Sequence, residues 1–321
     1  MTEPASALSV APQAPRVPAE LRDVAAYVAE SLAPATRKAY RSALRAFAAW
    51  CEAEDLEALP ATPETVARFL AAQAGRYRVA TLEQRLAAIR WAHETQGLDS
   101  PTAAKGVRST MRGIRRALGV APQRKAPATV DRLAAMTSHA DTSTLKGLRD
   151  RALLLFGFAS ALRRSELVAL TVADLELTER GLLVTLRRSK SDQAGHGHTR
   201  AVPLGRSPEL CPVRALGAWL EAAGIAEGPV FRSVDRHGKT GERLQPRAVG
   251  EVVKLYARRA GLEASSFGGH SLRAGFVTSA AEKGARAERI ADHTGHRSLG
   301  MIRVYTRRAD AFADHAGAKL L

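Results

Sequence analysis

Residues 269–305 read GHSLRAGFVTSAAEKGARAERIADHTGHRSLGMIRVY, and the interpretation of the whole chain begins from this stretch. Four of its residues are candidates for one site: His270, Arg273, His296 and Tyr305. The helix-forming composition of residues 274–293, interrupted by Gly284, predicts two helices joined by a tight turn. Such turns can bring cationic, imidazole and hydroxyl groups onto one wall of a cleft. The stretch therefore predicts a site that binds an oxyanion and carries a candidate nucleophile.

The charge balance indicates the class of partner. The chain has 321 residues, enough for two domains, and 48 Lys and Arg against 32 acidic residues give a net charge of +16. The sequence pI is about 10.6. A balance this basic favours a polyanion, and we expect double-stranded DNA as the partner. The alternative is a surface that is basic only for solubility.

Hydropathy and cysteine content indicate the compartment. No run of about 18 apolar residues is present, so we expect no membrane span. Residues 1–18 lack the pattern of a signal peptide, and we expect a cytoplasmic, nucleoid-associated protein. Cys51 and Cys211 lie far apart beside apolar residues. We predict that both are free, buried thiols.

Periodicity divides the chain into four parts. Residues 1–18 are rich in Pro, Ala and Ser and predict a disordered arm. Residues 19–118 show helical spacing throughout, with predicted helix starts at Pro34 and Thr36 (Thr36 as the cap), at Thr62-Pro63 and at Ser100-Pro101. Residues 119–127 contain two prolines and no periodicity, which predicts a linker. Residues 128–321 form the predicted second domain.

Basic residues recur along the predicted helices of the first domain. Placed at helix starts and along single faces, they suit contacts to DNA phosphates. Acidic partners are few between Lys105 and Arg116. The alternative for each of these residues is an ordinary solvated helix face. The predicted DNA contacts are Arg37, Lys38, Arg41, Arg85, Arg90, Lys105, Arg108 and Arg112.

The second domain mixes helices with a β-hairpin. Helices are predicted over residues 129–136, 146–161, 212–223 and 245–261, with a short strand at Val230-Phe231. Alternation at residues 182–186 and again at Val202 and Leu204 predicts a hairpin whose polar tip carries Lys190. The tip also holds His196 and His198, but no third ligand is evident, so we predict no metal site. The fold class is mainly α: an all-helical first domain followed by an α+β domain.

Five short elements of the sequence resemble those of the tyrosine recombinases, or phage integrases. Residues 161–167 (ALRRSEL) resemble their box I, with Arg163 as its arginine, and residues 270–273 (HSLR) resemble their His-x-x-Arg element. Residues 295–296 (GH), Tyr305 and the hairpin residues 189–192 (SKSD) complete the set in order. The resemblance implies a helical core-binding domain before a catalytic domain. It also implies a 3′-phosphotyrosyl intermediate, strand exchange within a homotetramer, and no cofactor.

The chemistry of these residue types agrees with that resemblance. Cleavage of a phosphodiester without a metal requires cations on the non-bridging oxygens, and Arg163 and Arg273 fit this need. Tyr305, with a hydroxyl whose ordinary pKa is near 10, would attack the phosphorus. Lys190 would protonate the leaving oxygen. His270 could accept the tyrosyl proton or bind the phosphate, and His296 could donate to a non-bridging oxygen.

Other interpretations of the same residues remain open at this stage. A type IB topoisomerase would use the same chemistry without exchanging partners. A DNA-binding regulator on this fold would need no chemistry, although the complete catalytic set argues against it. Glu166 is expected to orient box I, and residues 310–321 are expected to form a helix. Two residues depart from the family pattern: Arg164 replaces an aliphatic residue, and Ala274-Gly275 stands where many relatives have His-Ser or His-Thr.

Overall fold

The computed structural model of the chain describes residues 32–121, 124–187, 197–296, 298–300 and 302. The predicted arm, Lys190, Tyr305 and the predicted helix at residues 310–321 lie outside this part of the chain. Two compact units are present, Met1–Pro122 and Gln123–Leu321. Helices dominate both units, and the small sheets are antiparallel, so the predicted fold class is confirmed. Among the described residues, no helix combines the length and apolar character needed to cross a membrane.

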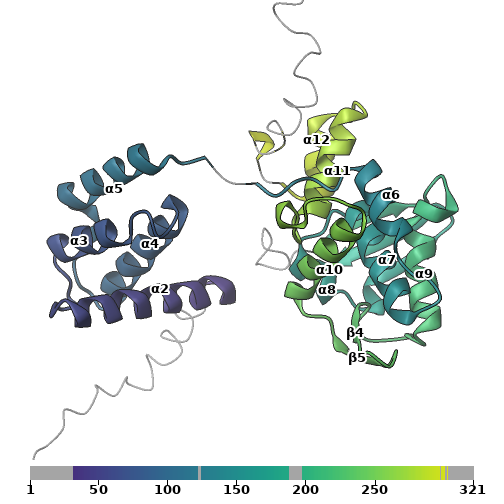
Figure 1. Cartoon of the computed structure of the whole chain (residues 1–321), viewed down its shortest axis with the longest axis horizontal. Coiled ribbons are helices and arrows are strands. Elements are labelled where there is room, and N and C mark those ends of the chain that lie inside the picture. The colour runs from purple at the N-terminus through teal and green to yellow at the C-terminus, as the bar shows by residue number, and fades with distance from the viewer. Residues whose placement is uncertain (1–31, 122–123, 188–196, 297, 301, 303–321) are drawn as a thin grey trace, which may run out of the picture. The chain divides into compact units, whose positions relative to one another are not determined.

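The first unit is all-helical in its described part. Figure 1 shows α2 and α5 on opposite sides of this unit, with α3 and α4 between them. Its core is built from residues such as Phe47, Phe69, Leu82 and Met111. The elements are α2 (Pro34–Ala53), α3 (Pro63–Gln73), α4 (Val79–Thr95), a 3₁₀ turn (Pro101–Ala103) and α5 (Lys105–Leu118).

Two of the predicted helix starts in this unit need correction. The start at Thr62 is confirmed, because its side chain accepts a hydrogen bond from the backbone N–H of Thr65. Thr36 is not a cap, because α2 begins at Pro34, whose fixed φ suits a first helical position. Ser100 caps only the 3₁₀ turn. The extended backbone of Ala104 then separates that turn from α5.

The second unit is larger and surrounds one central helix. Nine residues of α7 are buried, and Figure 1 shows α7 between α6 and α9. Its helices are α6 (Val130–Ser138), α7 (Leu145–Ala159), α8 (Arg164–Ala169), α9 (Pro212–Ala222), α10 (Pro246–Arg259), α11 (Ser271–Glu282) and α12 (Ala287–Thr294). Both cysteines of the chain are buried free thiols, as predicted.

The described residues of the second unit form two small antiparallel sheets. The predicted hairpin is confirmed as β2 (Gly181–Leu186) and β3 (His198–Pro203), with Val184 opposite Arg200. Pairing on the other side of β2 is β1 (Leu175–Thr178), a strand that the periodicity did not predict. The strand predicted at Val230-Phe231 is misplaced, because the observed strand begins at Arg232. Both residues are buried core, and pairing begins one residue later, between β4 (Arg232–Val234) and β5 (Thr240–Arg243).

The last residues of the predicted linker bond to the second unit. The backbone N–H of Ala126 donates to the carbonyl of Ser266 at 2.7 Å, and that of Ala128 to Ser271 at 2.9 Å. A Cβ at Gly275 would lie 1.9 Å from the carbonyl oxygen of Ala128. Glycine at position 275 is therefore required by this close backbone approach. Ala126 thus lies against Ser266, and Ala128 lies against α11, which begins directly after His270.

Candidate active site and DNA-binding surface

Arg163 lies directly before α8, where the chain turns out of α7. The carboxylate of Glu166 accepts hydrogen bonds from the backbone N–H of Arg163 at 2.9 Å and from its Nη1 at 2.6 Å. The side chain of Glu166 is 5% exposed, whereas that of Arg163 is 23% exposed. A buried carboxylate thus directs the guanidinium while part of it stays accessible. This geometry agrees with the orienting role expected for Glu166.

The end of α7 receives side-chain donors from three other elements. A helix leaves its last carbonyl groups without intrahelical partners. Here the carbonyl of Ala159 lies 2.9 Å from His293 Nε2 of α12, and that of Ser160 lies 3.2 Å from Arg200 Nη1 of β3. The carbonyl of Ala161 accepts from Arg273 Nη1 of α11 at 2.8 Å. Three consecutive carbonyl groups therefore join α7 to the elements that carry the predicted site.

Ala161 itself has an unusual backbone conformation. Its φ is 48°, in the left-handed region that a residue with a Cβ rarely adopts. The residue is fully buried and lies two positions before Arg163. This conformation turns the chain sharply between α7 and α8, and the bond from Arg273 stabilises it. The strained turn therefore couples the two predicted catalytic arginines.

Arg273 and His296 contact each other directly. Arg273 is 2% exposed, and its Nη2 lies 3.3 Å from Nε2 and 3.4 Å from Nδ1 of the His296 ring. The hydroxyl of Thr294 lies 2.6 Å from the carbonyl of Ile290, to which it donates its only proton. His296 Nδ1, at 2.5 Å from that hydroxyl, must then carry a proton. The lone pair of His296 is therefore on Nε2, the ring nitrogen nearer to Arg273 Nη2.

The electrostatic environment keeps the two site histidines neutral. Desolvation, followed by the charges of Arg273 and Arg163, lowers the pKa of His296 to about 4. Partial desolvation and the same two arginines also lower the pKa of His270, with a further contribution from Arg124. His270 precedes α11 and is open to solvent. Both imidazoles are therefore uncharged at neutral pH, in a field created by arginines.

Four of the six predicted catalytic residues belong to one electrostatic cluster: Arg163, His270, Arg273 and His296. The other two, Lys190 and Tyr305, lie outside the described residues. The ends of β2 and β3 that flank the Lys190 segment are described, at Leu186 and His198. Within the described part of the chain, no three His, Cys, Asp or Glu side chains gather as a metal site would require.

Two further residues of this cluster, Arg200 and His293, were not predicted from the sequence. Arg200 lies on β3 in the same alternation phase as the buried Val202, which was a readable signal that its side chain points inward. No comparable signal marked His293. Its ring stacks on Phe276, with centroids 4.6 Å apart, and only the folded chain brings it to the carbonyl of Ala159.

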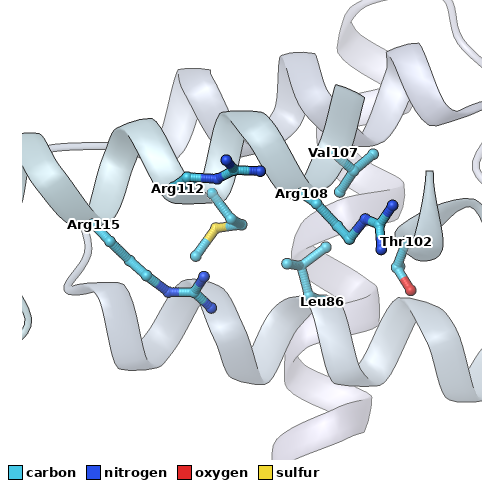
Figure 2. A pocket seen from close by; sticks show the side chains of 7 residues that line it. Leu86, Thr102, Val107, Arg108, Arg112 and Arg115 are labelled. Atoms are coloured by element: carbon cyan, nitrogen blue, oxygen red, sulfur yellow. The ribbon is translucent and has the colours of Figure 1, made fainter. Parts of the chain in front are cut away.

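A groove lined by arginines runs along α5 in the first unit. Its volume is about 380 Å³, and Figure 2 shows Leu86 of α4 below the side chains of Arg108 and Arg112, with Arg115 beside it. Arg115 pairs with Glu83 at 2.8 Å. Arg108 and Arg112 are exposed, and among the described residues neither has a carboxylate within salt-bridge distance. Unneutralised cations side by side on one face suit phosphate binding.

The remaining predicted DNA contacts differ in exposure. Lys38 and Arg41 of α2 and Lys105 of α5 are exposed, and Arg37 is half-buried. Arg90 is exposed and lies 3.7 Å from Glu94, one helical turn further along α4. A neighbouring carboxylate reduces the attraction of Arg90 to a phosphate.

Arg85 is the prediction that needs correction. Its side chain is buried, its Nη1 donates to Gln73 at 2.8 Å, and its guanidinium stacks 3.9 Å from the ring centroid of Tyr77. It also lies 5.7 Å from the ring centroid of Phe69. Arg85 therefore holds α4 to α3 and the turn that follows α3, and its position does not present it to DNA.

Comparisons with known proteins agree with this architecture. Residues 128–311 match the phage integrase family, and residues 26–94 match the phage integrase N-terminal SAM-like domain. The chain is 38% identical over 291 residues to an integrase/recombinase xerD homolog of Selenomonas ruminantium, covering 89% of this chain and 85% of that protein. It is 25% identical over 298 residues to the recombinase cre of Escherichia phage P1, covering 86% and 84%.

Solved structures show the same fold. A lambda integrase dimer bound to a COC′ core site superposes with a TM-score of 0.62 at 16% identity, over 89% of this chain and 75% of that chain. The XerH site-specific recombinase bound to palindromic difH substrate, in a post-cleavage complex, superposes with a TM-score of 0.56 at 19% identity, over 78% and 70%. The chain therefore belongs to the phage integrase family, and it is a tyrosine-type site-specific recombinase, an enzyme that breaks and rejoins DNA.

Proposed function

We propose that Arg163, Lys190, His270, Arg273, His296 and Tyr305 form the active site of this recombinase. The observation that carries the proposal is the cluster around Arg273. This buried guanidinium touches His296 and the turn before Arg163. Desolvation, followed by the charges of Arg273 and Arg163, holds the pKa values of both site histidines below their ordinary range. Such concentrated positive charge suits a phosphodiester, whose transition state is anionic.

The proposed reaction begins with attack of the Tyr305 hydroxyl oxygen on the scissile phosphorus. The bond from phosphorus to the 5′-oxygen breaks, leaving a 3′-phosphotyrosyl link and a free 5′-hydroxyl. Lys190 gives its proton to that leaving oxygen, and the tyrosyl proton passes to His270, whose neutral ring can accept it. The 5′-hydroxyl of the other duplex then attacks the phosphotyrosine, which rejoins the strand without ATP.

Arg163 and Arg273 would bind the non-bridging oxygens of that phosphate. Arg273 now lies beside His296 Nε2, and an arriving phosphate oxygen would compete for the same N–H group. The anion would also raise the pKa of His296, because a negative charge favours the protonated imidazole. His296 could then donate to the phosphate, as expected from the sequence.

Double-stranded DNA is the proposed substrate, contacted in the first unit through α2, α4 and α5. The exposed cations Arg108 and Arg112 support this, as do the titles of the lambda integrase and XerH structures, which name bound DNA sites. Exchange between two duplexes requires cleavage of four strands, and each chain would supply one Tyr305. We therefore propose a homotetramer on paired sites, acting on chromosomal or element DNA in the cytoplasm.

The test begins with selection of bound duplexes from a random-sequence pool by the full chain. The recovered duplex is then nicked a few nucleotides 3′ of each candidate phosphate, so that the short 5′-hydroxyl fragment diffuses away and cannot rejoin. We expect a covalent protein–DNA adduct from the wild type and none from Tyr305→Phe. An adduct that persists in Tyr305→Phe would overturn the assignment of the nucleophile.

The tetramer is tested separately. The mass of the wild-type complex with two unnicked duplexes should correspond to four chains. A complex of two chains that still converts two marked sites into recombinant products would contradict it.

A further inference from the structure

Arg200 is a buried cation that the proposed chemistry does not use. It lies at the middle of β3, opposite Val184 of β2, and only 6% of its surface is exposed. Burial without a matched carboxylate is costly for a guanidinium. Desolvation accordingly lowers the pKa of Arg200, while the charge of Glu166 opposes that shift. Its position therefore needs an explanation beyond packing.

Within the described part of the chain, the side-chain hydrogen bonds of Arg200 go to backbone carbonyl groups at helix ends. Nη1 donates to Ser160 at 3.2 Å and to Ala161 at 3.4 Å, directly after α7. Nη2 donates to Thr294 at 3.0 Å, at the end of α12. Among the described residues, no carboxylate forms a salt bridge with Arg200. One guanidinium thus joins the last turns of two helices to a strand.

These helix ends are the two that lead into the predicted catalytic residues. Ala161 is two residues before Arg163, and Thr294 is two residues before His296. β3 in turn follows the segment that carries Lys190. The fit at α12 is close, because Gly295 has φ of 66° and a Cβ there would lie 3.0 Å from Arg200 Nη2. A shift of Arg200 would therefore be felt at both ends.

We propose that Arg200 is a positioning residue of the recombination site, which sets the distance between Arg163 and His296 by tying the ends of α7 and α12 to β3. This proposal rests on the assignment of Arg163 and His296 to the active site, which is itself proposed above. Arg200 acts through other residues and does not bind the phosphate itself, since it is buried and its Nη1 and Nη2 donate to carbonyl groups inside the protein. Its second effect is electrostatic, because its charge contributes to the lowered pKa of His296.

The chain offers a matched control in Arg243. This arginine also lies on a strand, β5, and its Nη1 also caps helix-end carbonyl groups, those of Val168 and Ala169 at the end of α8. These carbonyl groups do not lead into a predicted catalytic residue. Arg243→Met and Arg200→Met therefore remove the same type of interaction, at a half-buried and a buried position, and the unfolding free energy of each variant shows how much of any rate change is structural loss.

The experiment compares the wild type, Arg200→Met, Arg200→Lys and Arg243→Met on the selected nicked duplex. At saturating duplex we expect Arg200→Met to form the covalent adduct about 10–100-fold more slowly, because small displacements of reacting groups have effects of that size. Its affinity for the duplex should stay within about threefold, because no DNA contact is removed. Arg243→Met should keep the wild-type rate.

A second readout needs no DNA. The pKa of His296, followed by NMR of the imidazole, should rise in Arg200→Met, since a positive charge is lost, and should stay low in Arg200→Lys and Arg243→Met. Arg200→Lys retains the charge but cannot bridge two helix ends with a fork, so it should restore the pKa and only part of the rate.

Two results would overturn the proposal. The first is an adduct rate in Arg200→Met equal to that of Arg243→Met, and the second is full rate in Arg200→Lys. If Arg200→Met does not fold, Arg200→Lys decides through its rate at saturating duplex. Failure of the wild type to form any adduct would instead count against the proposed function, and the two failures are therefore distinguishable.

Discussion

Arginine performs two different tasks in the two units of this protein. On α5, Arg108 and Arg112 are exposed and, within the described residues, have no acidic partner. Around the end of α7, Arg200 and Arg273 are buried and bonded to carbonyl groups. The first arrangement attracts any polyanion but holds it loosely. The buried arginines lose their hydration but are held in a fixed geometry. The proposed binding of one reacting phosphate by Arg273 requires such a geometry.

The largest expected effect is that of removing the buried guanidinium of Arg273. Arg273→Ala should slow adduct formation by about 10²–10³-fold or more at saturating duplex, because a preorganised donor to the transition state is lost. Gel quantification of the covalent complex over time measures this. Arg247→Ala, which alters a highly exposed arginine of the same unit, is the control and should match the wild type. If Arg273→Ala formed the adduct within about tenfold of the wild-type rate, the buried arginines near α7 would not have the separate catalytic task proposed for them.

Arg85 allows the same comparison of buried with exposed arginines within the first unit, because it is buried while Arg108 and Arg112 are exposed. Arg85→Ala should lower the free energy of unfolding by about 1–3 kcal/mol, because it deletes a buried hydrogen bond and a contact with the Tyr77 ring. Urea denaturation measures the change. The salt dependence of DNA binding should be unaltered. A large drop in that dependence, with unchanged stability, would return Arg85 to the DNA contacts.

The double substitution Arg108→Ala with Arg112→Ala tests the exposed group. The plot of log binding constant against log salt should lose about 0.9 in slope for each phosphate contact removed, or about 1.8 for two. The loss should be similar for specific and unrelated duplexes, since phosphate contacts carry no sequence information. Arg68→Ala is the control, because Arg68 already pairs with Glu54 at 2.8 Å. Equal slopes for both variants would exclude α5 as a phosphate-binding face.

The smallest expected effect is a change in the pH dependence of stability. The pKa of His296 is about 4 in the folded chain, below the ordinary 6.5, so the unfolded chain takes up the proton first as pH falls. The stability that the neutral His296 ring contributes is fully present above about pH 6.5 and is lost as pH falls toward 4. His296→Gln should reduce the difference in proton uptake by up to about one proton.

Thermal unfolding between pH 4 and 7 measures this slope. His237→Gln, at an exposed histidine, provides the matched substitution. An unchanged slope in His296→Gln would show that burial and the arginine cluster do not lower the pKa of this imidazole.

Much of the fold was readable from local patterns. Thr62-Pro63 starts a helix wherever it lies, because the cap and the fixed φ act within one turn. Patterns failed where neighbours in space decide. The four-residue strand β1 is defined by its pairing with β2, and its own composition does not reveal it.

The candidate site divides in the same way. By itself, the sequence determined the order and spacing of box I, the His-x-x-Arg element and Tyr305, because those residue types are what phosphoryl chemistry requires. Only the tertiary structure decided that Arg85 is buried, that Arg200 joins the ends of α7 and α12, and that the pKa of His296 is lowered. His293 and Ala159 are 134 positions apart, and Arg200 and Thr294 are 94 apart. Burial and electric field depend on such distant contacts, and these exist only once the chain has folded.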